Sequence, residues 1–327
     1  IYIMNLDHCN SHSSFKDKVS MSNLCQELTL PTTPIQHIDD SEGEIALCIL
    51  SAVNVGALND LNELENICDL SVRALEQIID YQDYPVKAAE VSTKRRRSLG
   101  IGYIGLAHYL AKNGVKYSDP KAWELVDRLS EAFQYHLLRA SCNIAEEKGK
   151  CEFFDRTKYA DGQLPIDHYK KEVDEIVPHK QRMAWESLRK DIAKHGLRHS
   201  TLSAQMPSES SSVVSNETNG IEPPRALMSI KKSKKGPLKQ IAPGFPKLKN
   251  DYTLLWDMPS NEGYINVVAM MQKYFDQAIS GNWSYNPLQY ENNEVPLSAM
   301  AQDMLTAYKL GWKTSYYQNT YDSKGEE

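Results

Sequence analysis

The sequence has no long apolar run and no excess of positive charge. Its longest nearly apolar stretch, IALCILSAVNVGAL at 45–58, has 14 residues, whereas a membrane-spanning helix needs about 20. The formal net charge is −6, and a general nucleic-acid-binding protein usually presents a basic balance or a basic face. A local basic cluster at 231–235 is interpreted as a solvated turn. We therefore expect neither a membrane nor a nucleic acid among the partners.

Cysteine is sparse and irregularly placed. Cys9 and His12 are three residues apart, but nothing downstream completes the usual four-ligand set of a metal site, so no metal ligand is predicted. The absence of a CxxC pair and of dense, regular spacing favours reduced thiols and a cytoplasmic location. The six cysteines stand at positions 9, 25, 48, 68, 142 and 151.

One glycine motif lacks the context that would make it a cofactor site. GIGYIG at 100–105 has the GxGxxG spacing of a dinucleotide-binding turn, but that fingerprint must follow an apolar strand. The preceding residues read STKRRRSL, which is basic and without strand character. We interpret the motif as a helix start whose glycines allow close packing against a neighbour.

The remaining composition is that of an ordinary globular protein of class α/β. The 327 residues are 41% hydrophobic and 24% charged. Two runs that are apolar on both faces, IYIMNL at 1–6 and EIALCILSAV at 44–53, are typical of buried parallel strands. The poorly periodic stretch 200–251 is predicted to be a functional or disordered loop. Apolar periodicity predicts helices at 59–81, 119–147, 180–194, 263–279 and 297–310.

The short stretch SNLCQE places one thiol between an amide and a carboxylate. In an extended segment Asn23, Cys25 and Glu27 would project to the same side, because side chains alternate with period two. Such a trio suits a hydroxylated substrate, with a hydrogen-bonding amide, an acid or base, and a reacting sulfur. A cysteine protease would instead pair the thiol with a histidine, and a buried structural cysteine remains the alternative.

Four motifs in order resemble the large, catalytic subunit of class I ribonucleotide reductase. They are NLCQE at 23–27, Cys48 in GEIALCILSAVN, MPSESSS followed by SNETNGIEPPR, and the tyrosine pair in KTSYYQNT. The resemblance runs from the first residue to the last. It implies the C-terminal half of a ten-stranded α/β barrel, with the reactive cysteine on a central finger loop and peripheral helices around it.

The resemblance also implies roles for the trio. Cys25 would become a thiyl radical that abstracts the 3′ hydrogen of a ribonucleoside diphosphate. Glu27 would accept the 3′-hydroxyl proton while the 2′-hydroxyl leaves as water, and Asn23 would hold the sugar hydroxyls. Cys48 would be one member of the reducing dithiol, whose second cysteine lies, in the family, before the point where this chain begins. A core residue in an apolar strand is the alternative for Cys48.

Two further segments are assigned in the same way. The resemblance places the substrate diphosphate at Ser208, Glu209, Ser210 and Ser211, although an ordinary Ser-rich loop has the same composition. Tyr316 and Tyr317 would pass the oxidising equivalent to Cys25. Neighbouring rings point to opposite faces of an ideal strand, so their stacking requires a local twist or bulge; a pair of interface or core aromatics is the alternative.

The resemblance finally implies partners. Residues 1–327 would form an incomplete part of the catalytic domain that works with an N-terminal half, in which the ATP and dNTP effector sites are expected. No cofactor is expected on this chain, because a dimetal small subunit would supply the radical. Thioredoxin or glutaredoxin would act as reductant, and a large-subunit dimer is expected. The alternative is a non-catalytic fragment or assembly subunit that retains the fold.

Overall fold

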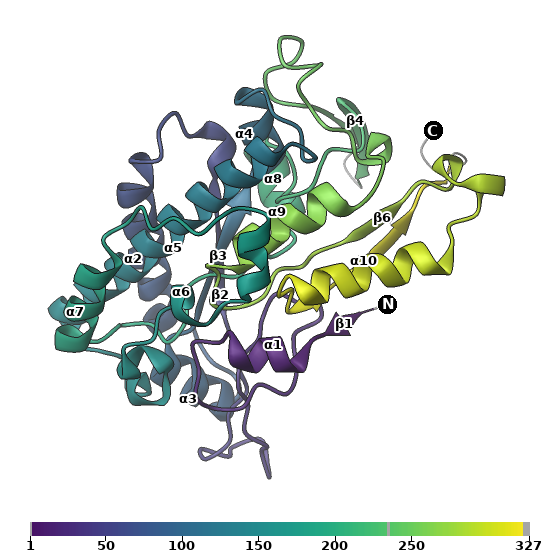
Figure 1. Ribbon diagram of the computed structural model, residues 1–327. Helices are drawn as coiled ribbons and strands as arrows, with labels where there is room; N and C mark the ends of the chain where they lie inside the picture. The colour runs from purple at the N-terminus through teal and green to yellow at the C-terminus, as the bar shows by residue number, and fades with distance from the viewer. Residues whose placement is uncertain (1, 234–235, 323–327) are drawn as a thin grey trace.

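The structure, a computed structural model, describes residues 2–233 and 236–322 (Figure 1). Part of the basic turn expected at 231–235 lies outside these residues. The strands are β1 (Ile3–Met4), β2 (Ile49–Asn54), β3 (Leu99–Ile104), β4 (Met228–Ser233), β5 (Gly236–Ile241), β6 (Trp283–Tyr285), β7 (Thr314–Ser315) and β8 (Gln318–Thr320). The helices are α1 (Leu6–Ser11), α2 (Glu63–Tyr81), α3 (Lys87–Arg96), α4 (Leu106–Lys112), α5 (Pro120–Lys148), α6 (Pro165–His168), α7 (Trp185–His195), α8 (Glu209–Val214), α9 (Glu262–Gln272) and α10 (Leu297–Lys309).

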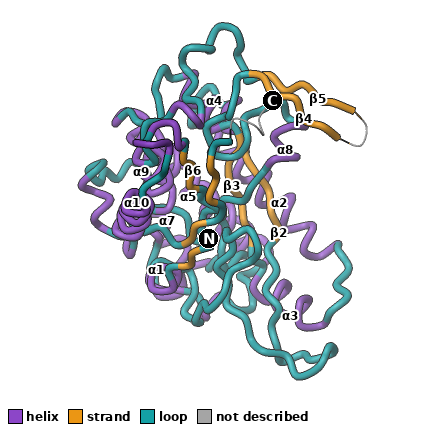
Figure 2. Tube along the Cα trace, turned by 90° about the vertical axis from the view of Figure 1, so that its right-hand side faces the viewer, coloured by secondary structure: helices purple, strands orange, loops and turns teal. Residues whose placement is uncertain are grey.

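Parallel extended segments form the centre of the molecule. β2 pairs with β3 in parallel over six residues, and a parallel bridge from Ile101 to Ser203 adds the segment 201–205. A second parallel bridge, Gln205 to Ile279, adds 277–285, whose β6 portion pairs in parallel with β8. In Figure 2 β2, β3 and β6 lie in the middle, with α9 and α10 on one side and α2 and α3 on the other. The predicted α/β class is confirmed.

The first apolar run does not form the predicted buried parallel strand. Only Ile3–Met4 is extended, and it pairs antiparallel with β7. Tyr2 is 52% exposed and Leu6 is 48% exposed. The backbone N–H of Asn5 makes the last hydrogen bond to this neighbour, to the carbonyl of Lys313, and from Leu6 the chain turns into α1.

Most predicted helices form close to their expected bounds. α5 begins at Pro120, although Asp119 accepts from the backbone N–H of Lys116 rather than capping the helix through its side chain. α7 begins at Trp185, five residues after the predicted start at 180. α7 is followed by Gly196 and α10 by Gly311, and both glycines have positive φ, at 76° and 88°.

The helix predicted at 263–279 ends seven residues early, at Gln272. Beyond it the chain is held by side chains that bind neighbouring strands rather than by helical hydrogen bonds. Asp276 accepts from the backbone N–H groups of Leu202 and Ser203, and the buried Lys313 Nζ donates to the carbonyls of 275–277. Apolar spacing could not predict this turn, because its polar partners lie far away in the sequence.

Most of the GIGYIG motif forms the strand β3, and only its last residue, Gly105, marks the predicted helix start, as the N-cap of α4. Gly100 and Gly102 lie inside the fully buried β3, whereas a dinucleotide fingerprint places its glycines in the turn after a strand. The expected close packing does occur. A Cβ on Gly100 would stand 2.9 Å from Cys48 Sγ, and one on Gly102 would stand 2.6 Å from the carbonyl of Ala204.

The stretch 200–251 is also more ordered than predicted. It contributes the central segment 201–205, the short helix α8 and the hairpin β4–β5, which projects from the body in Figure 2. Across residues 2–233 and 236–322, none of the helices combines the length and the apolar character that crossing a bilayer requires.

A buried carboxylate anchors α2 to the central segments. Glu76 is 1% exposed, and its carboxylate accepts hydrogen bonds from Arg97 Nε and from Arg198 Nε, each at 2.8 Å. It also lies 3.0 Å from His199 Nε2. Burial alone would raise the pKa of Glu76, but the hydrogen bonds from His199 and Arg97 outweigh it and lower the pKa to about 2. Glu76 therefore stabilises the fold while it is ionised.

We expect Glu76→Gln to lower the free energy of unfolding by about 3–5 kcal/mol, because it leaves buried cations without their counter-charge. Glu90→Gln is the matched control: Glu90 pairs with Lys87 and Lys94 at a solvent-accessible site, where water screens the pairs and their loss should leave the free energy of unfolding nearly unchanged. Urea unfolding would measure the free energy of unfolding of both variants.

The stabilisation by Glu76 should also depend on pH. It is present above the unfolded pKa of this carboxyl, near 4.5, and is lost as the pH falls towards 2. Equal effects of the two variants would contradict this role.

Candidate active site

Cys25 lies in a tight turn and not in an extended segment, so the predicted same-side projection of the trio was wrong in its geometry. The backbone N–H of Gln26 donates to the carbonyl of Asn23 at 3.2 Å, and Gln26 has a left-handed φ of 67°. Asn23 Oδ1 accepts from the backbone N–H of Leu28 at 3.0 Å, which closes the turn from the other side. The turn therefore presents Cys25 at its tip and fixes the amide beside it.

The thiol of Cys25 contacts a buried tyrosine that is 291 residues away in the sequence. Cys25 Sγ lies 3.5 Å from Tyr316 Oη, with the thiol as donor. Tyr316 is only 6% exposed. Hydrogen bonds with Tyr317 and with Cys25 raise the pKa of Tyr316, so this phenol keeps its proton at neutral pH. Oxidation of Tyr316 would therefore have to move a proton along with the electron.

The two adjacent tyrosines lie against one another. Their ring centroids are 3.9 Å apart with the planes tilted by 39°. Strand geometry stops between β7 and β8, at these two residues, which is the local break that stacking requires. Tyr317 is 47% exposed, so the pair leads from the surface to the buried ring and on to the thiol. Tyr2 also stacks on Tyr316, with centroids 5.6 Å apart.

Glu27 is 2% exposed and is held beside the same turn. Ser280 Oγ donates to the carbonyl of Cys25 and lies 3.3 Å from Glu27 Oε2. The backbone N–H of Ala278 donates to the carbonyl of Glu27 at 3.0 Å. One edge of the segment 277–280 thus fixes the thiol and the carboxylate relative to each other.

Cys48 meets the same segment from the other side. Its Sγ lies 3.5 Å from Gln277 Nε2, and burial raises the pKa of the Cys48 thiol well above the ordinary value. Cys48 stands immediately before β2, next to Gly100 of β3, and is partly buried. The segment 277–280 therefore connects the neighbourhoods of Cys48, Cys25 and Glu27.

The predicted diphosphate loop starts three residues after Gln205, whose carbonyl accepts from the backbone N–H of Ser280 at 2.9 Å. Ser208 is buried, and its Oγ donates to the carbonyl of Met206 at 3.3 Å. Glu209, Ser210 and Ser211 are exposed and form the first turn of α8. The loop is thus attached to the strand next to 277–280, with its following side chains open to solvent.

Sequence reasoning missed Ser280, Gln277 and Tyr2. Neither Ser280 nor Gln277 belongs to a motif; Gln277 was placed in the helix predicted at 263–279, and Ser280 follows that helix directly. Tyr2 was assigned to a buried strand. Only the contacts of these side chains reveal them, because each contact joins positions more than 200 residues apart.

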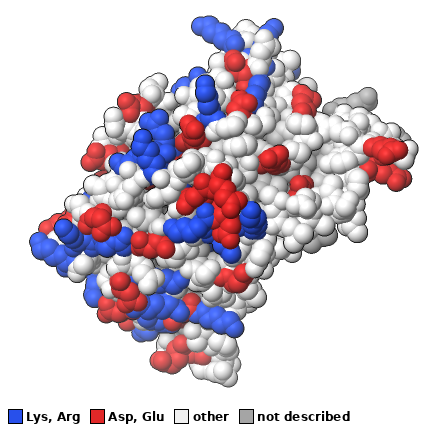
Figure 3. Space-filling model, in the orientation of Figure 1, with Lys and Arg blue, Asp and Glu red and all other residues white. Residues whose placement is uncertain are grey.

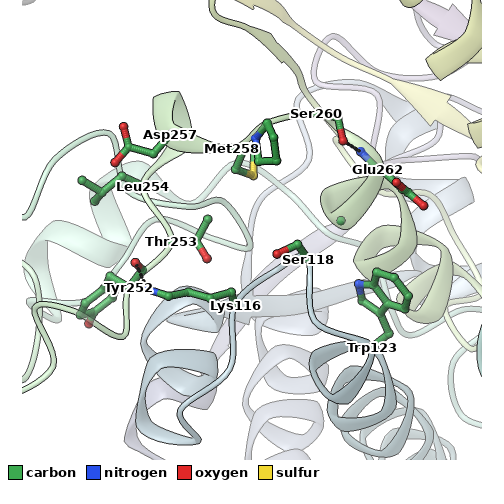
Figure 4. A pocket seen from close by; sticks show the side chains of 12 residues that line it. Lys116, Ser118, Trp123, Tyr252, Thr253, Leu254, Asp257, Met258, Ser260 and Glu262 are labelled. Atoms are coloured by element: carbon green, nitrogen blue, oxygen red, sulfur yellow. Dashed lines mark hydrogen bonds between the residues drawn. The ribbon is translucent and has the colours of Figure 1, made fainter. Parts of the chain in front are cut away.

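Other surface features are separate from this site. A cavity of about 460 Å³ lies at the N-terminal end of α9, whereas the reactive turn contacts the chain beyond its C-terminal end. Figure 4 shows Trp123, Ser118 and Lys116 along its walls. Lys116 Nζ already donates to the carbonyls of Asn250 and Tyr252, and Trp123 Nε1 donates to that of Tyr117. We therefore assign this cavity no role.

Neither charge nor metal-ligand chemistry marks a second site within residues 2–233 and 236–322. On the face shown in Figure 3, charged side chains of both signs cover the left-hand half, whereas the surface over α10 is largely uncharged. Within the part of the chain that the structure describes, no three His, Cys, Asp or Glu side chains converge as a metal site would require. Cys9 Sγ instead donates to the carbonyl of Lys313 at 3.5 Å, and His12 packs edge-on against His168.

The fold and this site define a class of protein: a parallel α/β domain in which a tyrosine pair leads from the surface to a thiol, beside a buried carboxylate. Residues 1–318 match the family model described as "Ribonucleotide reductase, barrel domain". The chain belongs to this family. The predicted α/β barrel is thereby confirmed, and the parallel segments described above are its contribution from this chain.

Three relatives illustrate the similarity. The chain is 57% identical to the ribonucleoside-diphosphate reductase subunit alpha of Haemophilus influenzae over 325 residues, 98% of this chain and 43% of that protein. It is 53% identical to the ribonucleoside-diphosphate reductase 1 subunit alpha of Escherichia coli, with the same coverage. The corresponding subunit of phage T4 is 40% identical over 334 residues, 100% of this chain and 44% of that protein. The chain thus spans less than half the length of these relatives.

Proposed function

We propose that this chain carries the catalytic residues of a ribonucleoside-diphosphate reductase, which replaces the ribose 2′-hydroxyl of its substrate by hydrogen. The observation that carries the proposal is the contact of Cys25 Sγ with Tyr316 Oη at 3.5 Å, with the ring of Tyr317 packed behind it. A thiol at the inner end of a phenol pair suits hydrogen-atom transfer, whereas no histidine contact prepares it for nucleophilic attack among the hydrogen bonds of the described residues.

In the proposed reaction Cys25 acts as a thiyl radical and removes the 3′ hydrogen atom of the sugar. Glu27 takes the 3′-hydroxyl proton, and the 2′-hydroxyl leaves as water. The burial of Glu27 and its contact with Ser280 support this role, because a positioned carboxylate in a water-poor site is an effective base. Asn23 orients the sugar hydroxyls through its amide, which Leu28 holds in place.

The net reduction needs two electrons and two protons, and a dithiol supplies both as it becomes a disulfide. We assign Cys48 as one of these thiols, with its partner outside this chain. Ser208, Glu209, Ser210 and Ser211 would bind the diphosphate, since three of them are exposed at the first turn of a helix next to the segment 277–280.

The partners follow from the same chemistry. A radical-generating small subunit with a dimetal centre would supply the oxidising equivalent at Tyr317, which is exposed. The N-terminal half of the large subunit, a large-subunit dimer, and thioredoxin or glutaredoxin are the further expected partners, in a cytoplasmic setting. The effector nucleotides ATP and dNTP would bind outside this chain.

The test is reconstitution. The chain would be combined with the remaining portion of a related alpha subunit, a small subunit, a dithiol reductant and CDP, and dCDP would be measured chromatographically. We expect dCDP to form, and to depend on both the small subunit and the reductant. An assembled complex that binds CDP but forms no dCDP would indicate a non-catalytic chain that retains the fold.

A further inference from the structure

A buried amide contacts the sulfur of Cys48. Gln277 is 0% exposed, and its Nε2 lies 3.5 Å from Cys48 Sγ and donates to the carbonyl of Leu99 at 2.9 Å. The other end of the amide, Oε1, is buried and has no hydrogen-bond partner among the residues that the structure describes. Gln277 thus uses its donor end on two groups and leaves its acceptor end unused.

The orientation of this amide follows from its neighbour. The carbonyl of Leu99 can only accept a hydrogen bond, so the group 2.9 Å away must be the NH₂ end of Gln277. The flipped amide would offer Oε1 to a thiol proton, but it would place two oxygens 2.9 Å apart. The Cys48 sulfur therefore faces a donor, and it is the acceptor in this contact.

We propose that Gln277 is a positioning residue that holds an N–H donor against the Cys48 sulfur and thereby favours its deprotonated form. The catalytic relevance of this contact rests on the proposed reduction. When Cys48 and a second thiol form a disulfide, both S–H bonds are broken, two protons and two electrons pass to the substrate, and an S–S bond forms. The Cys48 sulfur loses its only proton in that step. The N–H donor of Gln277 therefore stabilises the sulfur more strongly as the proton leaves.

The charges around Cys48 make such a donor necessary. Burial raises the pKa of this thiol, and the negative charges of Glu27 and Asp276 raise it further, whereas the hydrogen bond from Gln277 acts in the opposite direction. Lys313, a buried cation that reaches this region from the residue before β7, uses its Nζ on the carbonyls of 275–277. Gln277 is thus the uncharged group that offsets two carboxylates.

The test measures the reactivity of Cys48 without any substrate. The full alpha subunit would be alkylated with iodoacetamide between pH 7 and pH 10.5, and the Cys48 peptide quantified by mass spectrometry. Because burial places the pKa of this thiol above that range, we expect Gln277→Met to slow alkylation about tenfold at each pH measured, which corresponds to a pKa higher by about one unit. Gln277→Glu, which adds a third carboxylate, should slow it further.

Gln272→Met is the matched control, because Gln272 is also buried and donates to the carbonyls of Phe275 and Gln277 without touching Cys48. Its profile should equal that of the unmutated protein. The buried Cys68 and Cys142 report on folding, since they react only if a variant opens. Gln277→Glu keeps the size of glutamine, so a change in its alkylation rate reports the acidity of the thiol and not its accessibility.

A second measurement needs no substitution at Gln277. The ¹⁵N resonance of the Gln277 side-chain amide should change in Cys48→Ala, which removes the sulfur acceptor, and stay unchanged in Cys68→Ala. An unshifted resonance in Cys48→Ala, or an unchanged alkylation rate in a folded Gln277→Met variant, would overturn the proposal. Neither result depends on turnover, so this test can fail while dCDP still forms, and the reconstitution assay can fail while Gln277 still controls the thiol.

Discussion

Replacing Cys25 by serine is expected to abolish dCDP formation, by at least about 10³-fold, in the reconstituted enzyme. Serine keeps the size and the hydrogen bond, so the turn at 23–28 and the contact with Tyr316 should persist. An alcohol O–H bond is much stronger than a thiol S–H bond, however, so a tyrosyl radical cannot generate the alkoxyl radical. The loss should therefore appear in kcat.

The control for this variant is Cys142→Ala, which alters a buried cysteine of α5 far along the chain from the turn. It should retain turnover, apart from a modest loss of stability. CDP binding, measured by equilibrium dialysis, should be unchanged in Cys25→Ser. If Cys25→Ser supports dCDP formation near the rate of the unmutated enzyme, the proposed mechanism is wrong.

Replacing Tyr317 by phenylalanine is expected to block radical transfer with an effect of similar size, on the order of 10³-fold. Phenylalanine preserves the ring that packs 3.9 Å from that of Tyr316, and the backbone N–H that donates to Asn282 Oδ1 at 2.9 Å. It removes only the phenol O–H, without which loss of an electron cannot be coupled to loss of a proton. CDP affinity should remain within about twofold, or under about 0.5 kcal/mol.

The matched control is Tyr135→Phe, because Tyr135 lies on α5 against Trp185 and does not belong to the stacked rings of Tyr316 and Tyr317. Electron paramagnetic resonance of the small-subunit radical during turnover should show that Tyr317→Phe leaves this radical unconsumed, whereas Tyr135→Phe behaves like the unmutated enzyme. Normal turnover in Tyr317→Phe would refute the relay assignment. A CDP affinity that falls along with kcat would instead indicate a role in substrate binding.

The helices show how far sequence patterns reach. α2, α5 and α10 could be predicted because each carries an apolar stripe and is followed within four residues by a proline or a glycine, which are local properties. The helix at 263–279 was overpredicted for the same reason. Its apolar spacing continues past Gln272, but Asp276, Gln277 and Lys313 make buried polar contacts with distant strands, and these contacts override local propensity.

For the strands and the site, too, local sequence patterns could be read, whereas contacts between distant residues could not. The spacing of Gly100 and Gly102 matched a turn motif, but these glycines lie in a strand. Sequence spacing cannot reveal that other segments of the same chain approach this strand closely. The trio at 23–27 was found from its residue types, yet its geometry was wrong, because Gln26 adopts a left-handed conformation that no local rule predicts for glutamine.

The chemical groups of the site can be read from the sequence: a lone thiol between an amide and a carboxylate, a second thiol, a serine-rich loop and a tyrosine pair, in an order that matches one family. The contacts among these groups depend on the folded chain and could not be read in the same way. Cys25 reaches Tyr316 across 291 positions, and Ser280 and Gln277 join the two cysteines to one segment. The physical reason is that parallel strands bring distant positions side by side, whereas local preferences act over only a few residues.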